Sequence, residues 1–185
     1  MKLKYYLDMD WTRLVTLMGE PTKPRRIGSF FNPRFLPIVI IRYSNFFYSK
    51  GYRGLAKIGS LLNFLIFGIE VPARLEIGPG LVIPHPQGIV LGAARIGNNF
   101  TIFHQVTLGA KQIDFVYDER LRPSIGNDVT ISVGAKILGG IALADGCMVG
   151  ANAVVIRDVP AGNLAVGVPA RNKTQQEFTV VSNEE

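Results

Sequence analysis

Aliphatic residues recur at every sixth position over much of the chain, with one seven-residue interval before Val90 and a longer gap between Leu108 and Ile125. The thirteen aliphatic positions on this grid are Val71, Ile77, Ile83, Val90, Ile96, Ile102, Leu108, Ile125, Ile131, Ile137, Leu143, Val149 and Val155. A period of six fits neither an amphipathic helix nor an alternating strand. It predicts a short strand followed by a tight turn, repeated many times.

This spacing predicts a β-helix over residues 71–171. Three hexads close a three-sided coil of about 18 residues, and stacked coils lie about 4.8 Å apart. The aliphatic residues then point inward and form ladders. A small residue follows many of them and lets the chain turn a corner, as in IGPGLV, IGNNFT, IGNDVT and VGANAV. Because neighbouring coils bury one another's faces, stability depends on nearest neighbours.

The repeat is interrupted after Leu108, where the stretch GAKQIDFVYDERLRPS carries no hexad pattern. We expect a loop over residues 109–123 that leaves the β-helix. A structureless segment of this length inside a compact domain is usually functional.

The chain has two histidines, and the repeat predicts that they meet. His85 and His104 are each the third residue of a hexad, beginning at Ile83 and Ile102, and three hexads separate them. One should therefore lie a single coil above the other. A lone histidine in a turn commonly has a structural role, whereas two stacked histidines beside an extruded loop favour a functional one.

The segment IGPGLVIPHPQGIVLG carries a family resemblance that VTLGA, VGAKILG, VGANAVV and VGVPAR continue in order. Together they resemble the serine acetyltransferase branch of the hexapeptide-repeat acyltransferases, over roughly residues 68–171. The resemblance implies an all-β, left-handed parallel β-helix preceded by a short α-helical N-terminal region. It also implies an O-acetyltransferase that takes its acetyl group from acetyl-CoA.

By the same match His85 is the general base, and Glu70 replaces an aspartate that orients it. An alcohol is nearly all protonated at neutral pH, and a neutral imidazole can take its proton as the new C–O bond forms. The tetrahedral intermediate also needs hydrogen-bond donors for its oxyanion. The resemblance offers the backbone N–H groups of Gly109 and Ala110.

The resemblance further implies that coenzyme A lies along the β-helix between two subunits of a homotrimer or hexamer, with the extruded loop reaching over a neighbouring subunit's active site. The residues implied for the coenzyme A groove are Ala135, Lys136, Gly150, Ala151 and the stretch 167–171, which includes Gly167 and Arg171. Lys136, Arg157, Arg171 and Lys173 could meet its phosphates. A plain surface role is the alternative for each of these cations.

Two positions depart from the family pattern and bear on the acceptor. Serine acetyltransferases carry an aspartate before the catalytic histidine and a histidine in the loop, where this chain has Pro84 and Arg122. Proline cannot pair with an ammonium group, although Arg122 can bind a carboxylate. We expect Pro84, His104 and Arg122 to bind the acceptor, and the acceptor to be a sugar hydroxyl of a polysaccharide or its lipid-linked precursor. Serine O-acetylation in cysteine biosynthesis is the alternative.

Residues 1–70 are predicted to form a separate helical region, with helices over 3–18, 33–50 and 52–67. They hold 11 Lys+Arg and 4 Asp+Glu, a net charge of +7, whereas residues 71–185 carry −1. The helices either cap the open end of the β-helix and mediate oligomer contacts, or dip their apolar faces into a membrane surface. In the second case Arg25, Arg26, Arg34 and Lys50 would meet headgroups. No charge-free run reaches about 18 residues, so a membrane span is not expected.

The remaining features limit the other classes of function. A single cysteine, Cys147, excludes an internal disulfide, and no cleavable signal peptide is visible, so a cytoplasmic enzyme is expected, with the inner membrane face as its alternative place. No nucleic-acid module is recognisable. A metal-dependent hydratase like the γ-class carbonic anhydrases needs three histidine ligands, so no metal is expected. A non-catalytic β-helix scaffold stays open. Residues 172–185 form a C-terminal tail.

Overall fold

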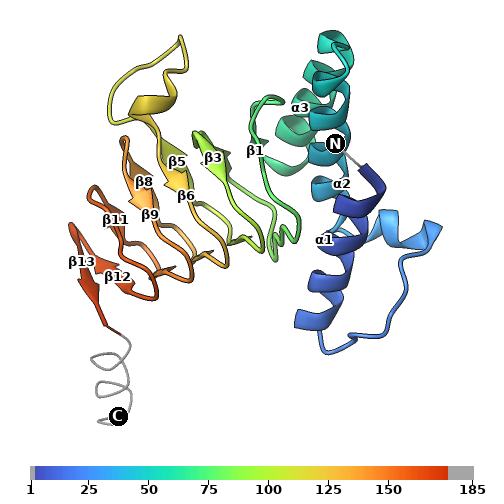
Figure 1. The fold of residues 1–185 in the computed structure, drawn as a ribbon. Helices are drawn as coiled ribbons and strands as arrows, with labels where there is room; N and C mark the ends of the chain where they lie inside the picture. Colours follow the sequence, from blue (N-terminus) through green and yellow to red (C-terminus); the bar gives the residue numbers. More distant parts are fainter. Residues whose placement is uncertain (1–2, 175–185) are drawn as a thin grey trace.

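The structure, a computed structural model, describes residues 3–174. Helices gather at one end of the molecule, and a stack of short strands extends from them (Figure 1). Residues 175–185, most of the predicted tail, lie outside the described part.

The helical region consists of α1 (Leu3–Leu17), the 3-10 helix η1 (Ile27–Phe31), α2 (Leu36–Ser49) and α3 (Arg53–Phe67). The helices expected over 3–18, 33–50 and 52–67 are confirmed, each end within three residues of its predicted place. Gly68 ends α3 in the left-handed conformation, with φ of 62°, which a glycine adopts without steric cost. The first strand begins at the next residue.

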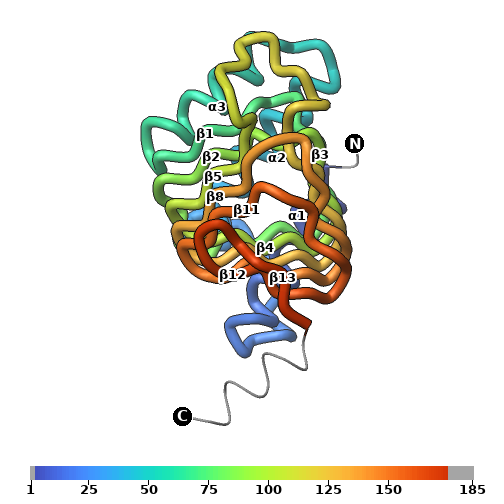
Figure 2. The backbone as a smooth tube through the Cα atoms, turned by 90° about the vertical axis from the view of Figure 1, so that its left-hand side faces the viewer, coloured from blue at the N-terminus to red at the C-terminus, as the bar shows by residue number. Residues whose placement is uncertain are grey.

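Short strands make up the second part. They are β1 (Ile69–Glu70), β2 (Ile89–Leu91), β3 (Arg95–Ile96), β4 (Thr101–Ile102), β5 (Thr107–Gly109), β6 (Ser124–Ile125), β7 (Thr130–Ile131), β8 (Lys136–Leu138), β9 (Ala142–Leu143), β10 (Met148–Val149), β11 (Val154–Val155), β12 (Leu164–Gly167) and β13 (Ala170–Lys173). They form three sheets, ordered β1-β2-β5-β8-β11, β3-β6-β9 and β4-β7-β10-β12-β13. All pairs are parallel except β12–β13. Seen from the β13 end, the coils lie one behind another (Figure 2).

Inward-pointing aliphatic residues form one ladder per sheet, as the period predicts. The ladders are Leu91–Leu108–Ile137–Val155, Ile77–Ile96–Ile125–Leu143 and Ile102–Ile131–Val149–Ala165. Every one of these side chains is buried. The core is therefore a set of repeated contacts between neighbouring coils.

One grid position is wrong. Val90 is only half-buried and pairs with Thr107, whereas Leu91 is fully buried and pairs with Leu108. The turn over residues 84–88, with its prolines and a glycine of positive φ, adds two residues before β2. The inward position therefore falls one residue later than the simple count indicates.

Polar side chains fasten the helices to the first coil. Arg42 of α2 and Asp10 of α1 form a fully buried ion pair, with Nε and Oδ2 2.7 Å apart. The backbone groups that this pair satisfies are the carbonyls of Ile77 and Gly78 and the N–H groups of Gly80 and Leu81. An uncovered end of a strand stack exposes unpaired backbone groups to other chains. Here the helical region covers that end.

A loop lies where the sequence predicts one over residues 109–123, although Gly109 still belongs to β5. It leaves the β-helix after β5, carries the short 3-10 helix η2 (Glu119–Leu121), and returns at β6 (Figure 1, yellow). Within residues 3–174, no helix combines the length and the apolar character that crossing a membrane requires.

Candidate active site

The two histidines lie side by side in successive coils. His85 lies in the turn before β2, and His104 follows β4 in the turn before β5. Val82 pairs with Thr101 across the coils, which brings the two turns into register. The ring centroids are 5.5 Å apart, and the rings are nearly perpendicular at 88°. The predicted stacking of the histidines is confirmed.

The two rings differ in their surroundings. His85 is exposed, whereas His104 is half-buried. The Nδ1 atom of His104 is buried and has no hydrogen-bond partner within residues 3–174. A buried polar nitrogen without a partner costs free energy. A histidine with a purely structural role would form a local hydrogen bond through that nitrogen. A purely structural role therefore does not account for His104.

The turn that carries His85 is held from several sides. The backbone N–H of Gln87 donates to the His85 carbonyl at 3.1 Å. The Nε–H of Arg34, which precedes α2, donates to the Pro84 carbonyl at 3.1 Å. The Phe103 ring lies 6.4 Å from the His85 ring, centroid to centroid. The helical region thus helps to fix the backbone on which the exposed imidazole stands.

Glu70 is the last residue of β1, one coil before the exposed histidine, and pairs with Val90 of β2. Its side chain is exposed and makes no hydrogen bond or ion pair within the described residues. Its role as the carboxylate that orients the imidazole stays a prediction.

The turns that follow the histidines form one edge of the β-helix. The N–H of Gly134 donates to the His104 carbonyl at 3.0 Å, and that of Asn152 to the Val133 carbonyl at 2.8 Å. In the last coils the N–H of Gly150 donates to Ala165 at 2.9 Å. The edge therefore runs from the histidines toward β12, coil by coil.

Most of the residues expected for coenzyme A lie on or next to this edge. Gly150 and Ala151 form its fourth turn, Gly167 ends β12 and Arg171 lies in β13. The Lys136 ammonium donates to the carbonyl of Gln105, which follows His104. The Ala135 side chain is fully buried in the core, so only the backbone of this residue could meet coenzyme A, and its role stays a prediction.

Gly109 and Ala110, the expected oxyanion donors, lie where β5 gives way to the loop, and both are half-buried. A Cβ atom placed on Gly109 would meet no atom within 4 Å. The backbone there is open to a close approach by a substrate. Donation to an oxyanion by these N–H groups stays a prediction.

The Arg122 side chain binds other groups of the protein, chiefly Asp114 of the same loop. Its guanidinium forms an ion pair with Asp114 at 2.9 Å, in which the two side chains are 11% and 5% exposed. It also donates to the carbonyls of Asp114 at 3.1 Å and Gly92 at 3.3 Å. A substrate carboxylate would have to displace these contacts. The geometry favours a loop anchor over the expected acceptor ligand.

Sequence reasoning missed the companions of this anchor. The Tyr117 ring lies between two guanidinium groups, 3.9 Å from Arg74 and 3.6 Å from Arg122. Its hydroxyl donates to the Ala93 carbonyl at 2.8 Å, and burial raises the pKa of this phenol. The only signal in the sequence is the density of charged and aromatic residues in DFVYDERLR.

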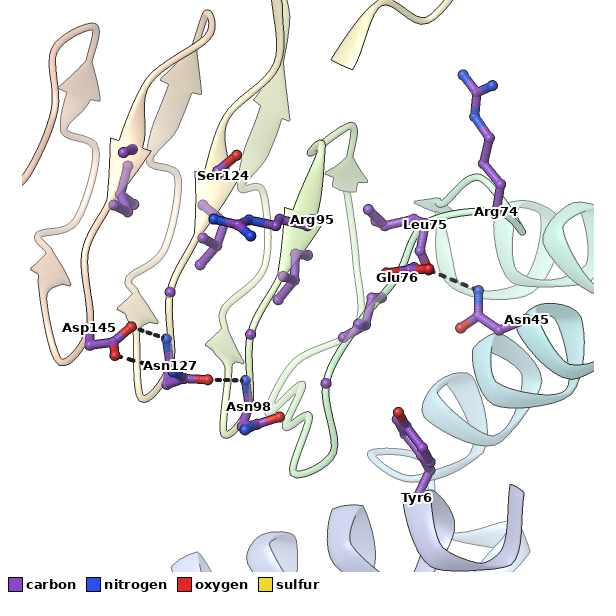
Figure 3. A pocket seen from close by; sticks show the side chains of 18 of the residues that line it. Tyr6, Asn45, Arg74, Leu75, Glu76, Arg95, Asn98, Ser124, Asn127 and Asp145 are labelled. Atoms are coloured by element: carbon purple, nitrogen blue, oxygen red, sulfur yellow. Dashed lines mark hydrogen bonds between the residues drawn. The ribbon is translucent and has the colours of Figure 1, made fainter. Parts of the chain in front are cut away.

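A hollow of about 1070 Å³ lies over β3, β6 and β9, facing the helical region, and Arg95, Asn45 and Asp145 are among its lining residues (Figure 3). Hydrogen bonds from Asn127 hold the pKa of Asp145 below its usual range. Neither histidine lines this hollow, and the His85 ring is exposed on a different side of the β-helix.

Comparisons with known proteins agree with this arrangement, although no family model matches the chain. A serine acetyltransferase of Helicobacter pylori is 36% identical over 171 residues, which cover 91% of this chain and 98% of that protein. A serine acetyltransferase of Mycobacterium tuberculosis is 34% identical over 131 residues, covering 70% of this chain and 56% of the other.

Solved structures show the same fold. The serine acetyltransferase of Neisseria gonorrhoeae aligns with a TM-score of 0.81 and 25% identity, over 100% of this chain and 71% of that chain. The soybean apoenzyme aligns with a TM-score of 0.81 and 31% identity, over 92% and 69%. A serine acetyltransferase in complex with CoA aligns with a TM-score of 0.78 and 26% identity, over 92% and 69%.

The strand stack is thus the left-handed β-helix of these enzymes. The chain belongs to the serine acetyltransferase family of hexapeptide-repeat O-acetyltransferases.

Proposed function

We propose that this chain transfers an acetyl group from acetyl-CoA to the hydroxyl of serine, with His85 as the general base. The observation that carries this proposal is the match over 98% of the length of a relative named as a serine acetyltransferase. The exposed imidazole on the edge that leads to the expected coenzyme A residues gives it a chemical basis.

In this mechanism the neutral His85 ring accepts the hydroxyl proton while the oxygen attacks the thioester carbonyl. The tetrahedral intermediate carries a negative oxygen, for which the N–H groups of Gly109 and Ala110 are the donors. Collapse breaks the C–S bond, and the departing sulfur takes the proton from the imidazolium. The base accounts for roughly 10²–10⁴ of the rate enhancement. Glu70 orients the ring and stabilises its charged form.

We further propose a trimer as the active form. Within the described residues the His85 ring is exposed, and neither histidine lines the hollow over β3, β6 and β9. A thioester site has to exclude water to favour transfer over hydrolysis. The loop also presents Ile113, Phe115 and Val116 at 83%, 96% and 88% exposure, a surface that suits a neighbouring subunit.

A sugar hydroxyl is the second candidate acceptor, and two observations favour it. Pro84 stands beside the histidine where the family has an aspartate for the ammonium of serine. Arg122 is held by Asp114, so its guanidinium is not free for the carboxylate of serine. An uncharged acceptor needs neither contact, whereas both charged groups of serine lack an obvious partner here.

The test is an acceptor screen with purified protein, acetyl-CoA and a thiol reagent that reports released coenzyme A. The panel holds serine, threonine and uncharged sugar acceptors, with His85→Asn as the matched inactive variant. Saturable release that is fastest with serine and lost in His85→Asn supports the proposal. Release with sugars alone selects the second candidate. Wild-type rates that equal those of His85→Asn with every acceptor would refute both.

A second variant sharpens the choice of acceptor. Pro84→Asp restores the carboxylate that the family places beside the histidine. If the pocket binds serine, the KM for serine should fall roughly tenfold, as expected for one charged contact. An unchanged KM would mean that the ammonium group does not lie next to Pro84.

A further inference from the structure

Helix α3 packs against the rest of the protein with its small and polar residues. Ala56 and Asn63 are its buried residues, and the Asn63 amide donates to the Pro37 carbonyl at 3.1 Å. Gly59 approaches Ser44 of α2 so closely that a Cβ atom on the glycine would collide with the serine hydroxyl. The inner side of α3 therefore carries little of its apolar surface.

The large apolar residues of α3 point outward instead. The α3 apolar face consists of Leu55, Ile58, Leu61, Leu62, Leu65 and Ile66, which are between 42% and 68% exposed. At 100° per residue these six side chains fall within an arc of about 140°, and Phe64, which is 55% exposed, lies outside this arc. A helix on a water-exposed surface normally shows the reverse arrangement. A contiguous apolar surface of this kind marks an interaction site.

Cations without acidic partners border this face. Lys50, Arg53 and Lys57 lie at the α2–α3 turn and at the start of α3, and all three are exposed. None of them forms an ion pair within residues 3–174. Residues 21–69 as a whole contain eight Lys+Arg and no Asp or Glu. Tyr52, 61% exposed, stands in the same turn.

We infer that α3 lies on an anionic lipid surface, with its apolar face in the headgroup region and Lys50, Arg53 and Lys57 among the phosphates. Interfacial helices combine a wide apolar face with flanking cations and aromatic residues in this way. Each cation near an anionic leaflet adds attraction, and the effect falls off within a Debye length. The α2–α3 hairpin stands at the end of the molecule away from β13, where a surface can approach it (Figure 1).

Charge favours lipid over a second copy of the chain as the occupant. In a helix-to-helix contact between two copies, the second copy would bring the same cations, and residues 21–69 hold no carboxylate to meet them. An anionic headgroup layer supplies the missing counter-charge. The helix has 15 residues, fewer than the roughly 20 that span a bilayer, so it would lie along the surface.

The test is flotation of the full-length protein with vesicles of phosphatidylcholine alone or mixed with phosphatidylglycerol. We expect binding to the anionic vesicles at low salt, little binding to the neutral ones, and release as salt rises. Leu62→Glu with Leu65→Glu should weaken binding by at least about tenfold. Reversing Lys50, Arg53 and Lys57 to glutamate should weaken it by roughly a hundredfold.

Leu17→Glu is the matched control, because Leu17 is 62% exposed at the end of α1, outside the α3 apolar face. It should bind vesicles as the wild type does. Size-exclusion chromatography and thiol release from acetyl-CoA show whether each variant keeps its assembly and fold. Absence of wild-type binding to anionic vesicles would overturn the inference. The inference would also be overturned if the α3 variants bound anionic vesicles as the wild type does. The same holds if these variants lost their oligomeric state and the wild type did not bind lipid.

Discussion

The β-helix repeats one apolar contact many times, whereas the helical region joins the first coil through contacts that occur once each: an apolar core, one buried ion pair and a few long-range hydrogen bonds. Ile131 contacts Ile102 in the coil before and Val149 in the coil after, and the same relation holds along each ladder. Arg42 and Asp10, 32 residues apart, join α1 and α2 to the first coil. The contacts are repeated along one part and occur once each in the other.

The largest expected effect tests whether the chemistry belongs to the β-helix. His85→Asn should lower acetyl transfer by roughly 10²–10⁴, because asparagine cannot accept the hydroxyl proton. Thiol release at saturating acetyl-CoA measures it, and an unchanged circular dichroism spectrum shows that the fold persists.

His104→Asn is the matched variant one coil away, and we expect a loss of less than about tenfold, because this ring supports the base without taking the proton. A larger loss in His104→Asn than in His85→Asn would move the base to the neighbouring coil. The second coil would then carry the chemistry.

The next prediction tests the buried ion pair that joins the helical region to the first coil. Arg42→Met leaves Asp10 charged and buried without its partner, and should lower the free energy of unfolding by about 3–5 kcal/mol. Urea unfolding can be followed by fluorescence of Trp11, the single tryptophan, which is buried in α1. Circular dichroism follows the β-helix in the same samples.

Lys23→Gln provides the control for that variant, since the Lys23–Glu20 pair is about half exposed on both sides. Its loss should cost less than about 1 kcal/mol. If Arg42→Met cost no more than Lys23→Gln, the buried pair would add nothing measurable to the apolar packing between the helices and the first coil.

The same contrast explains what the sequence could and could not predict. A period of six makes each ladder position visible many times, so the β-helix, its loop and the meeting of His85 with His104 follow from spacing. Val90 was misplaced because the turn before β2 is longer than the repeat, and spacing within a turn is not periodic. Leu91 takes the inward position instead.

Single long-range polar contacts leave no such signal. In the sequence, Arg42 is only a charge that interrupts an apolar helix, and nothing links it to Asp10. Arg122 is a similar case. Its position matches a substrate-binding residue of the family, but its partner in the structure is Asp114, eight residues away within an irregular loop. Such pairs become visible only when the chain is folded.

A smaller effect tests whether each coil of the β-helix contributes about equally to the free energy of unfolding. Ile131→Val and Ile137→Val each remove one methylene from a fully buried ladder position, and each should cost about 0.5–1.5 kcal/mol. We expect similar costs because each side chain has a ladder neighbour on both sides. Urea unfolding followed by circular dichroism measures both. A difference above about 2 kcal/mol would mean that one coil holds more stability than its neighbour.

The smallest expected effect concerns the loop. Like the junction between the helices and the first coil, the loop has polar contacts that each occur only once. Tyr117→Phe keeps the ring between Arg74 and Arg122 but removes the hydroxyl that donates to Ala93. Burial raises the pKa of this phenol, so the hydroxyl stays protonated and able to donate throughout the neutral range. Its loss should loosen the loop by about 1 kcal/mol.

The measurement is limited trypsin digestion, since the loop offers cleavage after Lys111 and Arg120. We expect cleavage there to accelerate roughly fivefold while global unfolding is unchanged, because local opening costs less than unfolding the ladders. Tyr52→Phe, on the exposed turn before α3, is the matched control and should digest as the wild type does. Equal rates for Tyr117→Phe and Tyr52→Phe would show that the arginine stack and the Asp114 ion pair hold the loop without the hydroxyl. The loop would then be held by its charged side chains and the stacked Tyr117 ring.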